Sequence, residues 1–235
     1  MKYGLIVLVL MVSLELVYGA ELTEKSESEH PADAVAVKDD SFRTYTNNQY
    51  FQSPEELRAF FADRIDLEII VFALRPLRND FSEVFGGILS QMKHLKQLTL
   101  ARTQFTPSQL ESIVRNLDFS RLESLNLGDT RIGSRGVLVL ATYLSRARQL
   151  ALKEIDLRGC FMEDAGAAAI IRLLPRLPNL EILNLIENNI TDASAIALLG
   201  VLPTMEHLTH FLVSANPKVS ASTWKNFERF AREHS

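Results

Sequence analysis

The sequence has one cysteine, Cys160, among its 235 residues. One cysteine excludes an intramolecular disulfide, so packing and hydrogen bonds must hold the fold together. Long apolar runs are also absent after residue 20, and a membrane-spanning helix needs about 20 consecutive apolar residues. We therefore expect the chain beyond residue 20 to be soluble, with no membrane segment.

The sequence also has only a small net charge and few ligand-binding motifs. The formal net charge is −4 at pH 7, which gives no basic footprint for nucleic acid or anionic lipid. The pair Gly86-Gly87 stands alone and does not form a phosphate-binding loop. The five histidines show no metal-ligand spacing with carboxylates or with the cysteine; they are His30, His94, His207, His210 and His234. We expect no metal, no cofactor and no nucleic-acid partner.

Residues 1–20 have the pattern of a secretory signal peptide. An early cation, Lys2, is followed by a short apolar stretch and then by two small residues. This order is typical of a leader that is cleaved, here after Gly19 or Ala20. A membrane anchor is the alternative interpretation, but the apolar stretch is short and Glu15 interrupts it.

Two segments separate this leader from the main part of the chain. Residues 21–49 are polar, and a disordered tail is predicted because little apolar surface is available to offset the entropy of ordering. Within residues 50–66, Ser53 precedes a proline and stands three residues before Glu56, which is typical of a helix start. A capping helix is predicted there, and another over residues 220–235.

Residues 67–219 contain one unit that recurs. In its clearest copy, Leu152, Ile155, Leu157 and Cys160 have the spacing L-x-x-L-x-L-x-x-C, and a run of helix-forming residues follows. Similar copies begin at Leu67, Leu95, Leu122, Leu180 and Leu208. A strand pattern that gives way to a helical pattern within about 28 residues indicates a stacked repeat, because neither element can bury its apolar face alone.

The second half of each unit resembles the long leucine-rich repeats of the ribonuclease-inhibitor class. Met162, Gly166, Ile170 and Leu174 recur at helical spacing. Counting the first leucine of a unit as position 1, position 9 holds the Asn or Cys of that class at Cys160, Asn188 and Asn216. The resemblance implies an α/β fold: a right-handed horseshoe of about six repeats, with parallel strands on the concave face, helices outside and helical caps. It also implies that the side chain at position 9 hydrogen-bonds to loop backbone.

The concave face is the predicted partner-binding surface. Successive side chains of a strand point to opposite faces, so the residues between the leucines point inward. The predicted contact residues are Gln97, Thr99, Arg102, Ser124, Asn126, Asp129, Glu154, Asp156, Arg158, Asn184, Glu187 and His210. Their centre is predicted at Glu154, Asp156 and Arg158, flanked by Asn126 and Asn184. The alternative is that these positions are only solvated.

An enzymatic function is not favoured by the sequence. Glu154 and Asp156 are paired carboxylates on one strand face, a spacing suited to acid–base chemistry, but no histidine stands beside them. Ran GTPase-activating proteins share this repeat class, so a catalytic Arg102 or Arg158 is an alternative that rests on fold analogy alone. No catalytic residue is assigned.

A four-residue string suggests another alternative. Arg75, Pro76, Leu77 and Arg78 match the R-x-L-R string of secreted effectors from plant-pathogenic oomycetes. That resemblance implies delivery into a host cell, to its cytoplasm or nucleus, and interference with host defence. The string lies inside the first repeat instead of the tail, and no acidic E-E-R motif follows it.

The sequence therefore predicts a secreted, monomeric, non-enzymatic protein that binds a protein partner through its concave face. Asn189, in the sequon Asn189-Ile190-Thr191, is a candidate N-glycosylation site. An oomycete-type effector and a GTPase-activating protein are the alternative interpretations.

Overall fold

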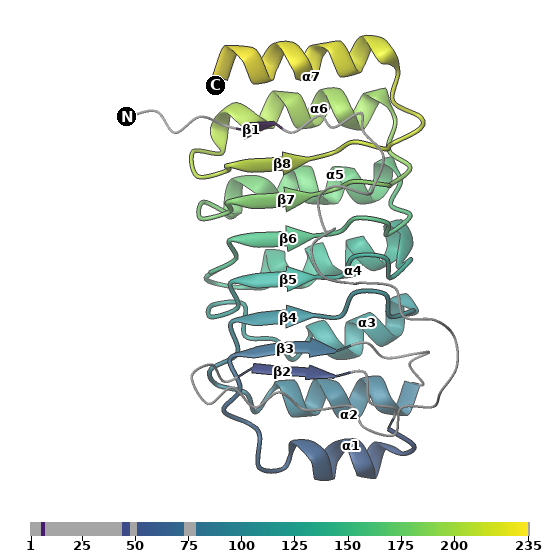
Figure 1. The fold of residues 1–235 in the computed structure, drawn as a ribbon, viewed down its shortest axis with the longest axis vertical. Coiled ribbons are helices and arrows are strands. Elements are labelled where there is room, and N and C mark those ends of the chain that lie inside the picture. Colours follow the sequence, from purple (N-terminus) through teal and green to yellow (C-terminus); the bar gives the residue numbers. More distant parts are fainter. Residues whose placement is uncertain (1–5, 8–43, 48–50, 73–78, 235) are drawn as a thin grey trace, which may run out of the picture.

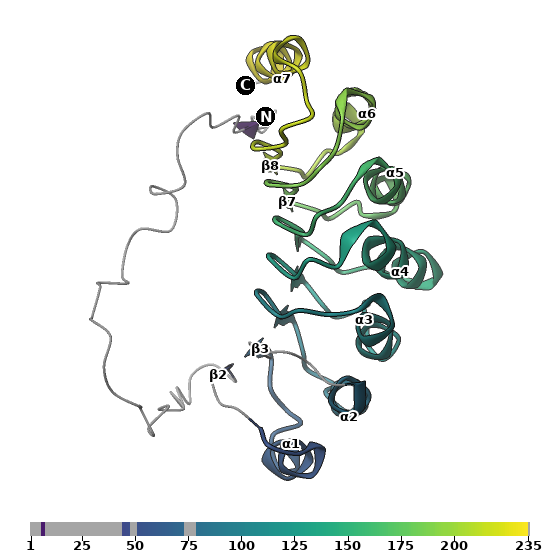
Figure 2. The same ribbon diagram turned by 90° about the vertical axis from the view of Figure 1, so that its right-hand side faces the viewer.

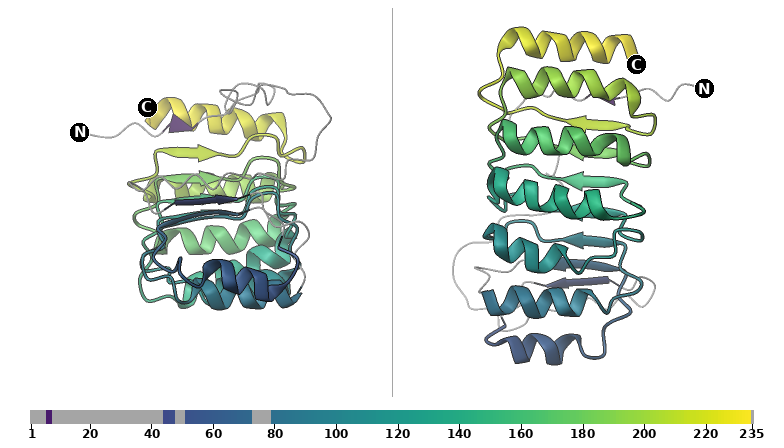
Figure 3. Two further views of the ribbon diagram at one scale, coloured as in Figure 1. Left: turned by 60° about the horizontal axis from the view of Figure 1, so that its bottom comes forward. Right: turned by 180° about the vertical axis from the view of Figure 1, so that it is seen from behind.

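The computed structural model describes residues 6–7, 44–47, 51–72 and 79–234. These residues form a curved stack of strand–loop–helix units (Figures 1 and 2), with the strands on the inner side and the helices on the outer side. Seen from behind, the helices lie side by side along the stack and cover the sheet (Figure 3). The α/β solenoid that the repeats predict is confirmed. No helix within the described residues has both the length and the apolar character needed to cross a membrane.

Each repeat contributes one short strand to a parallel sheet. The six repeat strands are β3 (Ile69–Phe72), β4 (Gln97–Thr99), β5 (Ser124–Asn126), β6 (Glu154–Asp156), β7 (Ile182–Asn184) and β8 (His210–Leu212). They pair in sequence order, and equivalent repeat positions lie opposite one another in every pair. This register turns repeat positions into columns that run along the stack.

The sheet has one strand more at each edge than the repeats predict. β2 (Thr44–Asn47) pairs parallel to β3, and β1 (Ile6–Val7) pairs parallel to β8. β2 falls in the last part of the segment for which the sequence predicts a disordered tail, so the prediction is corrected for those four residues. The physical reason is that an edge strand presents unpaired backbone groups, and a short β-prone segment such as Thr-Tyr-Thr-Asn can satisfy them.

The repeat helices are α2 (Asn79–Leu89), α3 (Pro107–Val114), α4 (Gly133–Arg146), α5 (Asp164–Leu173) and α6 (Asp192–Val201). Short 3-10 helices extend two of them, η1 (Leu174–Arg176) after α5 and η2 (Leu202–Thr204) after α6. Side-chain caps mark the starts of α3 and α6, whereas α4 and α5 begin without one. At α3, the Thr106 hydroxyl accepts the Gln109 N–H at 3.2 Å, and the Gln109 side chain accepts the Thr106 N–H at 2.7 Å. This reciprocal pair is a capping box.

Helices also cap both ends of the stack. α1 (Pro54–Phe61) begins at Ser53, whose hydroxyl accepts the Glu56 N–H at 3.1 Å, as the sequence predicts. α1 covers the first repeat through Phe61, which lies 6.2 Å from the ring of Phe85. At the other end, α7 (Ala221–His234) places Phe227 6.0 Å from Phe211 of β8, and both rings are fully buried. The caps therefore close the apolar core at the two terminal repeats.

Between the sheet and the helices runs one continuous core. The apolar residues at positions 4 and 6 of the repeats are at most 1 % exposed where the side chains are described; they are Ile70, Leu98, Leu100, Leu125, Leu127, Ile155, Leu157, Leu183, Leu185, Phe211 and Val213. The small residues Gly136 and Gly166 in α4 and α5 are also buried, which lets these helices lie close to the preceding loops. Each unit buries its apolar face only against its neighbours.

A ladder of buried polar side chains at position 9 links consecutive loops. The Asn188 amide donates to the carbonyl oxygens of Leu185 in its own loop, at 3.1 Å, and of Leu157 in the preceding repeat, at 2.9 Å. Its Oδ1 accepts the Met162 N–H at 2.9 Å. Asn216 repeats the pattern one unit later, with Nδ2 2.7 Å from the Val213 oxygen and 3.1 Å from the Leu185 oxygen. We call this set the position-9 ladder.

Cys160 belongs to the same ladder. Its thiol is fully buried and donates to the carbonyl oxygen of Leu127, 3.2 Å away in the preceding repeat. The Thr130 hydroxyl donates to the same oxygen at 2.6 Å. Burial raises the pKa of the Cys160 thiol to about 12. The thiol therefore stays protonated at neutral pH and serves as a structural donor.

Two more contacts between repeats lie at the edges of the strands and helices. The Asp164 carboxylate of α5 accepts the Thr191 N–H and hydroxyl at the start of α6, at 2.9 and 2.7 Å. Asp192 of α6 accepts the Ser220 N–H before α7 in the same way, at 2.8 Å.

At position 2 the charges alternate along the stack in the order Glu68, Lys96, Glu123, Lys153 and Glu181. Ion pairs join the first two of these residues at 2.8 Å and the next two at 2.7 Å.

The position-9 ladder yields a test of what holds the stack together. Replacing Asn188 or Asn216 with Ala leaves buried carbonyl and N–H groups without partners, so each change is expected to lower the free energy of unfolding by about 2–4 kcal/mol. Gln91→Ala, which truncates an exposed amide, should have little effect. Urea denaturation measures all three; a ladder variant no less stable than Gln91→Ala would contradict this account.

Candidate protein-binding face

The structure arranges the predicted contact residues in columns. Position 3 aligns Gln97, Ser124, Glu154, Ile182 and His210, and position 5 aligns Thr99, Asn126, Asp156, Asn184 and Leu212. Of the predicted contact residues, Gln97, Arg102 and His210 are exposed; Thr99, Ser124, Asn126, Asp129, Glu154, Arg158 and Glu187 are half-buried; Asp156 and Asn184 are buried. The side chains are brought together as predicted, but their accessibility differs.

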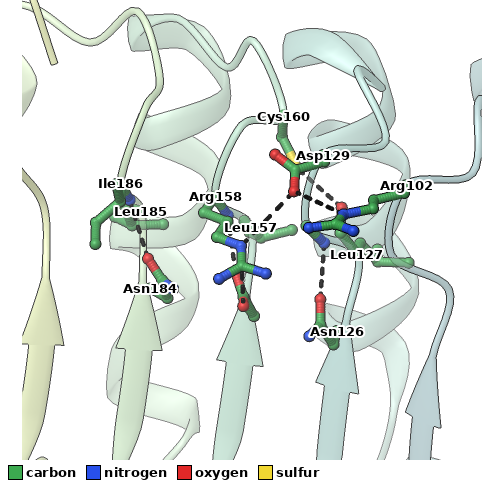
Figure 4. A network of polar contacts seen from close by, with 12 residues as sticks. Arg102, Asn126, Leu127, Asp129, Leu157, Arg158, Cys160, Asn184, Leu185 and Ile186 are labelled. Atoms are coloured by element: carbon green, nitrogen blue, oxygen red, sulfur yellow. Dashed lines mark hydrogen bonds and ion pairs between the residues drawn. The ribbon is translucent and has the colours of Figure 1, made fainter. Parts of the chain in front are cut away.

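Polar side chains at position 5 form hydrogen bonds within their own repeats. In three successive repeats the side-chain oxygen accepts the N–H two residues on (Figure 4): Asn126 from Gly128 at 2.8 Å, Asp156 from Arg158 at 3.0 Å and Asn184 from Ile186 at 3.1 Å. Asp156 is 5 % exposed and Asn184 is 7 % exposed. These side chains therefore turn the chain at the end of each strand, and Asp156 and Asn184 offer little surface to a partner.

Position 8 follows this turn and adopts a left-handed backbone in every repeat from β4 to β8. The φ angles lie between 55° and 60° at Arg102, Asp129, Gly159, Glu187 and Ala215. Among these residues only Gly159 is a glycine, the residue that adopts this conformation without a steric cost. The left-handed turn aims the side chains at position 8 along the edge where the chain leaves the sheet. We call positions 8 and 10 of the repeats the rim.

A chain of ion pairs crosses from the rim to the concave face. Asp129 Oδ2 lies 3.9 Å from Arg102 Nε and 3.8 Å from Arg158 Nε, and Arg158 Nε is 3.9 Å from Asp156 Oδ2 (Figure 4). The pair of Asp129 with the exposed Arg102 is long and open to solvent, and such pairs contribute little to stability. The pair of Arg158 with the buried Asp156 is less exposed. Glu154 is engaged separately, since it accepts the Ser124 hydroxyl at 2.9 Å. Arg102 and Arg158 are thus positioned but remain accessible to an approaching carboxylate.

The C-terminal half of the concave face carries three apolar side chains. Ile182 and Leu212 lie on β7 and β8, and Ile186 follows β7; all three are half-buried. The prediction from sequence chose polar side chains for the contact centre and left these three out. The signal was present, because apolar residues at inward-facing strand positions cannot reach the core between sheet and helices.

The rim carries an exposed aromatic residue that the sequence prediction also missed. Phe161, at position 10, is 51 % exposed and has a φ of 57°. Its ring lies 5.2 Å from the guanidinium carbon of Arg131, which occupies position 10 of the preceding repeat and has a φ of 56°. Cation–π contact holds the two side chains together at the surface. An aromatic residue directly after the buried position 9 was the sequence signal for this feature.

The remaining predicted features lie elsewhere or outside the described residues. Most of the predicted signal peptide and all of Arg75, Pro76, Leu77 and Arg78 fall outside them. Asn189 is half-buried at the rim, where its N–H donates to the Met162 carbonyl at 2.8 Å, and its glycosylation stays a prediction. Within the described part of the chain, no group of three or more His, Cys, Asp or Glu residues could hold a metal ion.

Comparison with known families agrees with this architecture. A family model described as Leucine Rich repeat matches residues 121–141 and 176–199, which include β5 with the first part of α4 and β7 with most of α6. The chain therefore contains leucine-rich repeats. No curated protein matches the sequence. Leucine-rich repeat domains generally serve protein–protein interaction, through the extended inner surface that stacked repeats create.

Replacing Gly159 tests whether Asp129 packs against the left-handed turn at this residue. An added Cβ at Gly159 would lie 2.3 Å from Asp129 Oδ1, whereas a Cβ at Gly133, which also has a positive φ, would meet nothing within 4 Å. Gly133→Ala should cost about 1–2 kcal/mol for the backbone alone. Gly159→Ala should cost more, because Asp129 must also move. Equal losses in urea denaturation would show that Asp129 is not packed against this turn.

Asp156 gives a prediction about pH. Burial raises the pKa of its carboxyl, and the N–H and guanidinium of Arg158 offset only part of this rise. The ionised group therefore destabilises the fold above the raised pKa, and this penalty fades as the pH falls through it. Asn can accept the same N–H, as Asn126 and Asn184 do, so Asp156→Asn should be more stable than the natural protein at pH 7.

The measurement is urea denaturation of both proteins at pH 7 and near pH 4. The stability difference should shrink on acidification. A variant less stable than the natural protein at pH 7 would mean that the pair with Arg158 outweighs the burial of the charge.

Proposed function

We propose that this leucine-rich repeat protein binds a protein partner stoichiometrically, without catalysis, at a surface that joins the rim to the C-terminal half of the concave face. The anchors are Phe161 and Arg131 on the rim, Arg158 in the same repeat as Phe161, and the apolar side chains of Ile182 and Leu212. Phe161 is the observation that carries the proposal.

Phe161 combines two costs that its own fold does not offset. A non-glycine residue in the left-handed region loses roughly 1–2 kcal/mol, and half of the ring remains in contact with water. Burial of the ring under a partner would recover the hydrophobic free energy that exposure forgoes. An aromatic residue beside an arginine is also the composition typical of interface hot spots.

The neighbouring side chains indicate what the partner presents. Arg158 lies three residues before Phe161 and shares Asp129 with Arg102. Because these pairs are long, a partner carboxylate can replace Asp129 at little cost. The half-buried Ile182, Ile186 and Leu212 suit an apolar segment. A partner segment with apolar side chains and a carboxylate near the rim fits this surface best.

The contact centre proposed here differs from the polar centre that the sequence predicts. Glu154 and Arg158 stay in it, whereas Asp156 and Asn184 are removed because their side chains are buried in strand-end turns. A secreted protein that works outside the cell would use this surface. The alternative, an effector inside a foreign cell, would use the same surface. In both cases the protein would act by binding.

Variants at the two anchors test the proposal. Phe161→Ala and Arg158→Glu should each weaken binding of a partner, isolated with the natural protein, by tenfold or more, about 1.4 kcal/mol or above. Leu138→Ala is the control, since Leu138 is 39 % exposed on α4, away from the rim. Surface plasmon resonance gives the affinities and circular dichroism checks folding. Unchanged affinity in both anchor variants, or an equal loss in Leu138→Ala, would contradict the proposal.

A further inference from the structure

A pocket lies at the end of the strands opposite the rim. There α3 and α4 end and the chain returns to β5 and β6. Its volume is about 650 Å³. Three arginines line it, Arg115 after α3, Arg146 in the last turn of α4 and Arg148 in the loop that follows. All three arginines are exposed. Within the described residues, no ion pair involves any of them.

The nearby carboxylates are engaged by other groups. Asp118 is the one acidic residue among the residues that line the pocket. It accepts the Ser120 N–H at 3.0 Å and hydroxyl at 2.6 Å, and it pairs with Arg121 at 3.3 Å. Glu111 accepts the Tyr143 hydroxyl at 3.0 Å. A local excess of positive charge therefore remains in a chain whose net charge is negative.

Helix ends alone do not account for these arginines. Cations are favoured at helix C-termini, where carbonyl groups lack partners. At the end of α4, however, Arg176 already serves this purpose, since its guanidinium donates to the carbonyl oxygens of Ser145 and Ala147. Arg146 instead lies over the Tyr143 ring, with its guanidinium carbon 5.6 Å from the ring centre. Stacking of this kind orients a guanidinium and leaves its N–H groups free to donate.

We propose that this pocket binds a small organic molecule that carries phosphate groups. Guanidinium groups donate paired hydrogen bonds to phosphate oxygens, and three of them can surround a multiply charged anion. The pocket is an open depression of the surface, and its volume exceeds what a single phosphate needs. Tyr143, Leu117 and Ala147 provide apolar surface for the rest of the ligand. This site is independent of the proposed partner-binding face.

Calorimetric titration of the full chain at physiological salt tests the site. The probes are pyrophosphate, which is the anion alone, and inositol hexakisphosphate, a phosphorylated ring; a Glu-rich octapeptide supplies carboxylates for comparison. Inositol hexakisphosphate should bind saturably at one site and more tightly than either other probe. Arg146→Gln and Arg148→Gln should each weaken this binding tenfold or more.

Arg135→Gln is the matched control, because it removes the same charge from an exposed position at the other end of α4. It should leave the affinity unchanged, as should Phe161→Ala, which separates this site from the partner-binding face. Equal weakening by Arg135→Gln would reduce the effect to net charge and overturn the proposal. Absence of saturable binding would overturn it too, as would tighter binding of the octapeptide, which would assign the pocket to an acidic protein segment.

Discussion

Hydrogen bonds between consecutive loops are the constraint on which the rest of this structure depends. A repeat with a three-residue strand has few backbone bonds of its own, and its loop leaves carbonyl oxygens buried beneath the next unit. Asn188 and Asn216 satisfy these oxygens in the preceding loop as well as in their own, and Cys160 satisfies one in the preceding loop. Buried polar groups without partners are costly, so each unit is stable only when its neighbour is in register.

Register in turn determines the functional surface. Because equivalent positions pair across every strand, one side chain per repeat enters each column, and the chemistry of a column can change from unit to unit without a change in the backbone. The concave face is polar around Glu154 and apolar around Ile182, although both occupy position 3 of their repeats. The side chain at position 5 closes the strand-end turn, which fixes the direction in which the rim residues point.

Much of this could be predicted from the sequence, and the exceptions have physical reasons. Leucine spacing predicted the strands and the core, because burial against neighbours leaves only one arrangement for such a period. The ladder was implied by the resemblance to repeats of the ribonuclease-inhibitor class. Alternation predicted that Asp156 faces inward, but it could not show that a turn would bury the carboxylate. The exposure of Phe161 follows from a left-handed backbone, which spacing does not reveal. The arginine pocket joins residues about 30 positions apart whose side chains no repeat position relates.

The alternation of Glu and Lys at position 2 bears on how such a chain can change in length. Opposite charges follow one another at this position, and two of the neighbouring pairs form ion pairs, Glu68 with Lys96 and Glu123 with Lys153. Loss of one internal unit would bring two like charges side by side, which opposes pairing of the strands. Loss or duplication of two units together would preserve the alternation. Along this part of the stack, the charge pattern therefore repeats every two units, even though the structure repeats every unit.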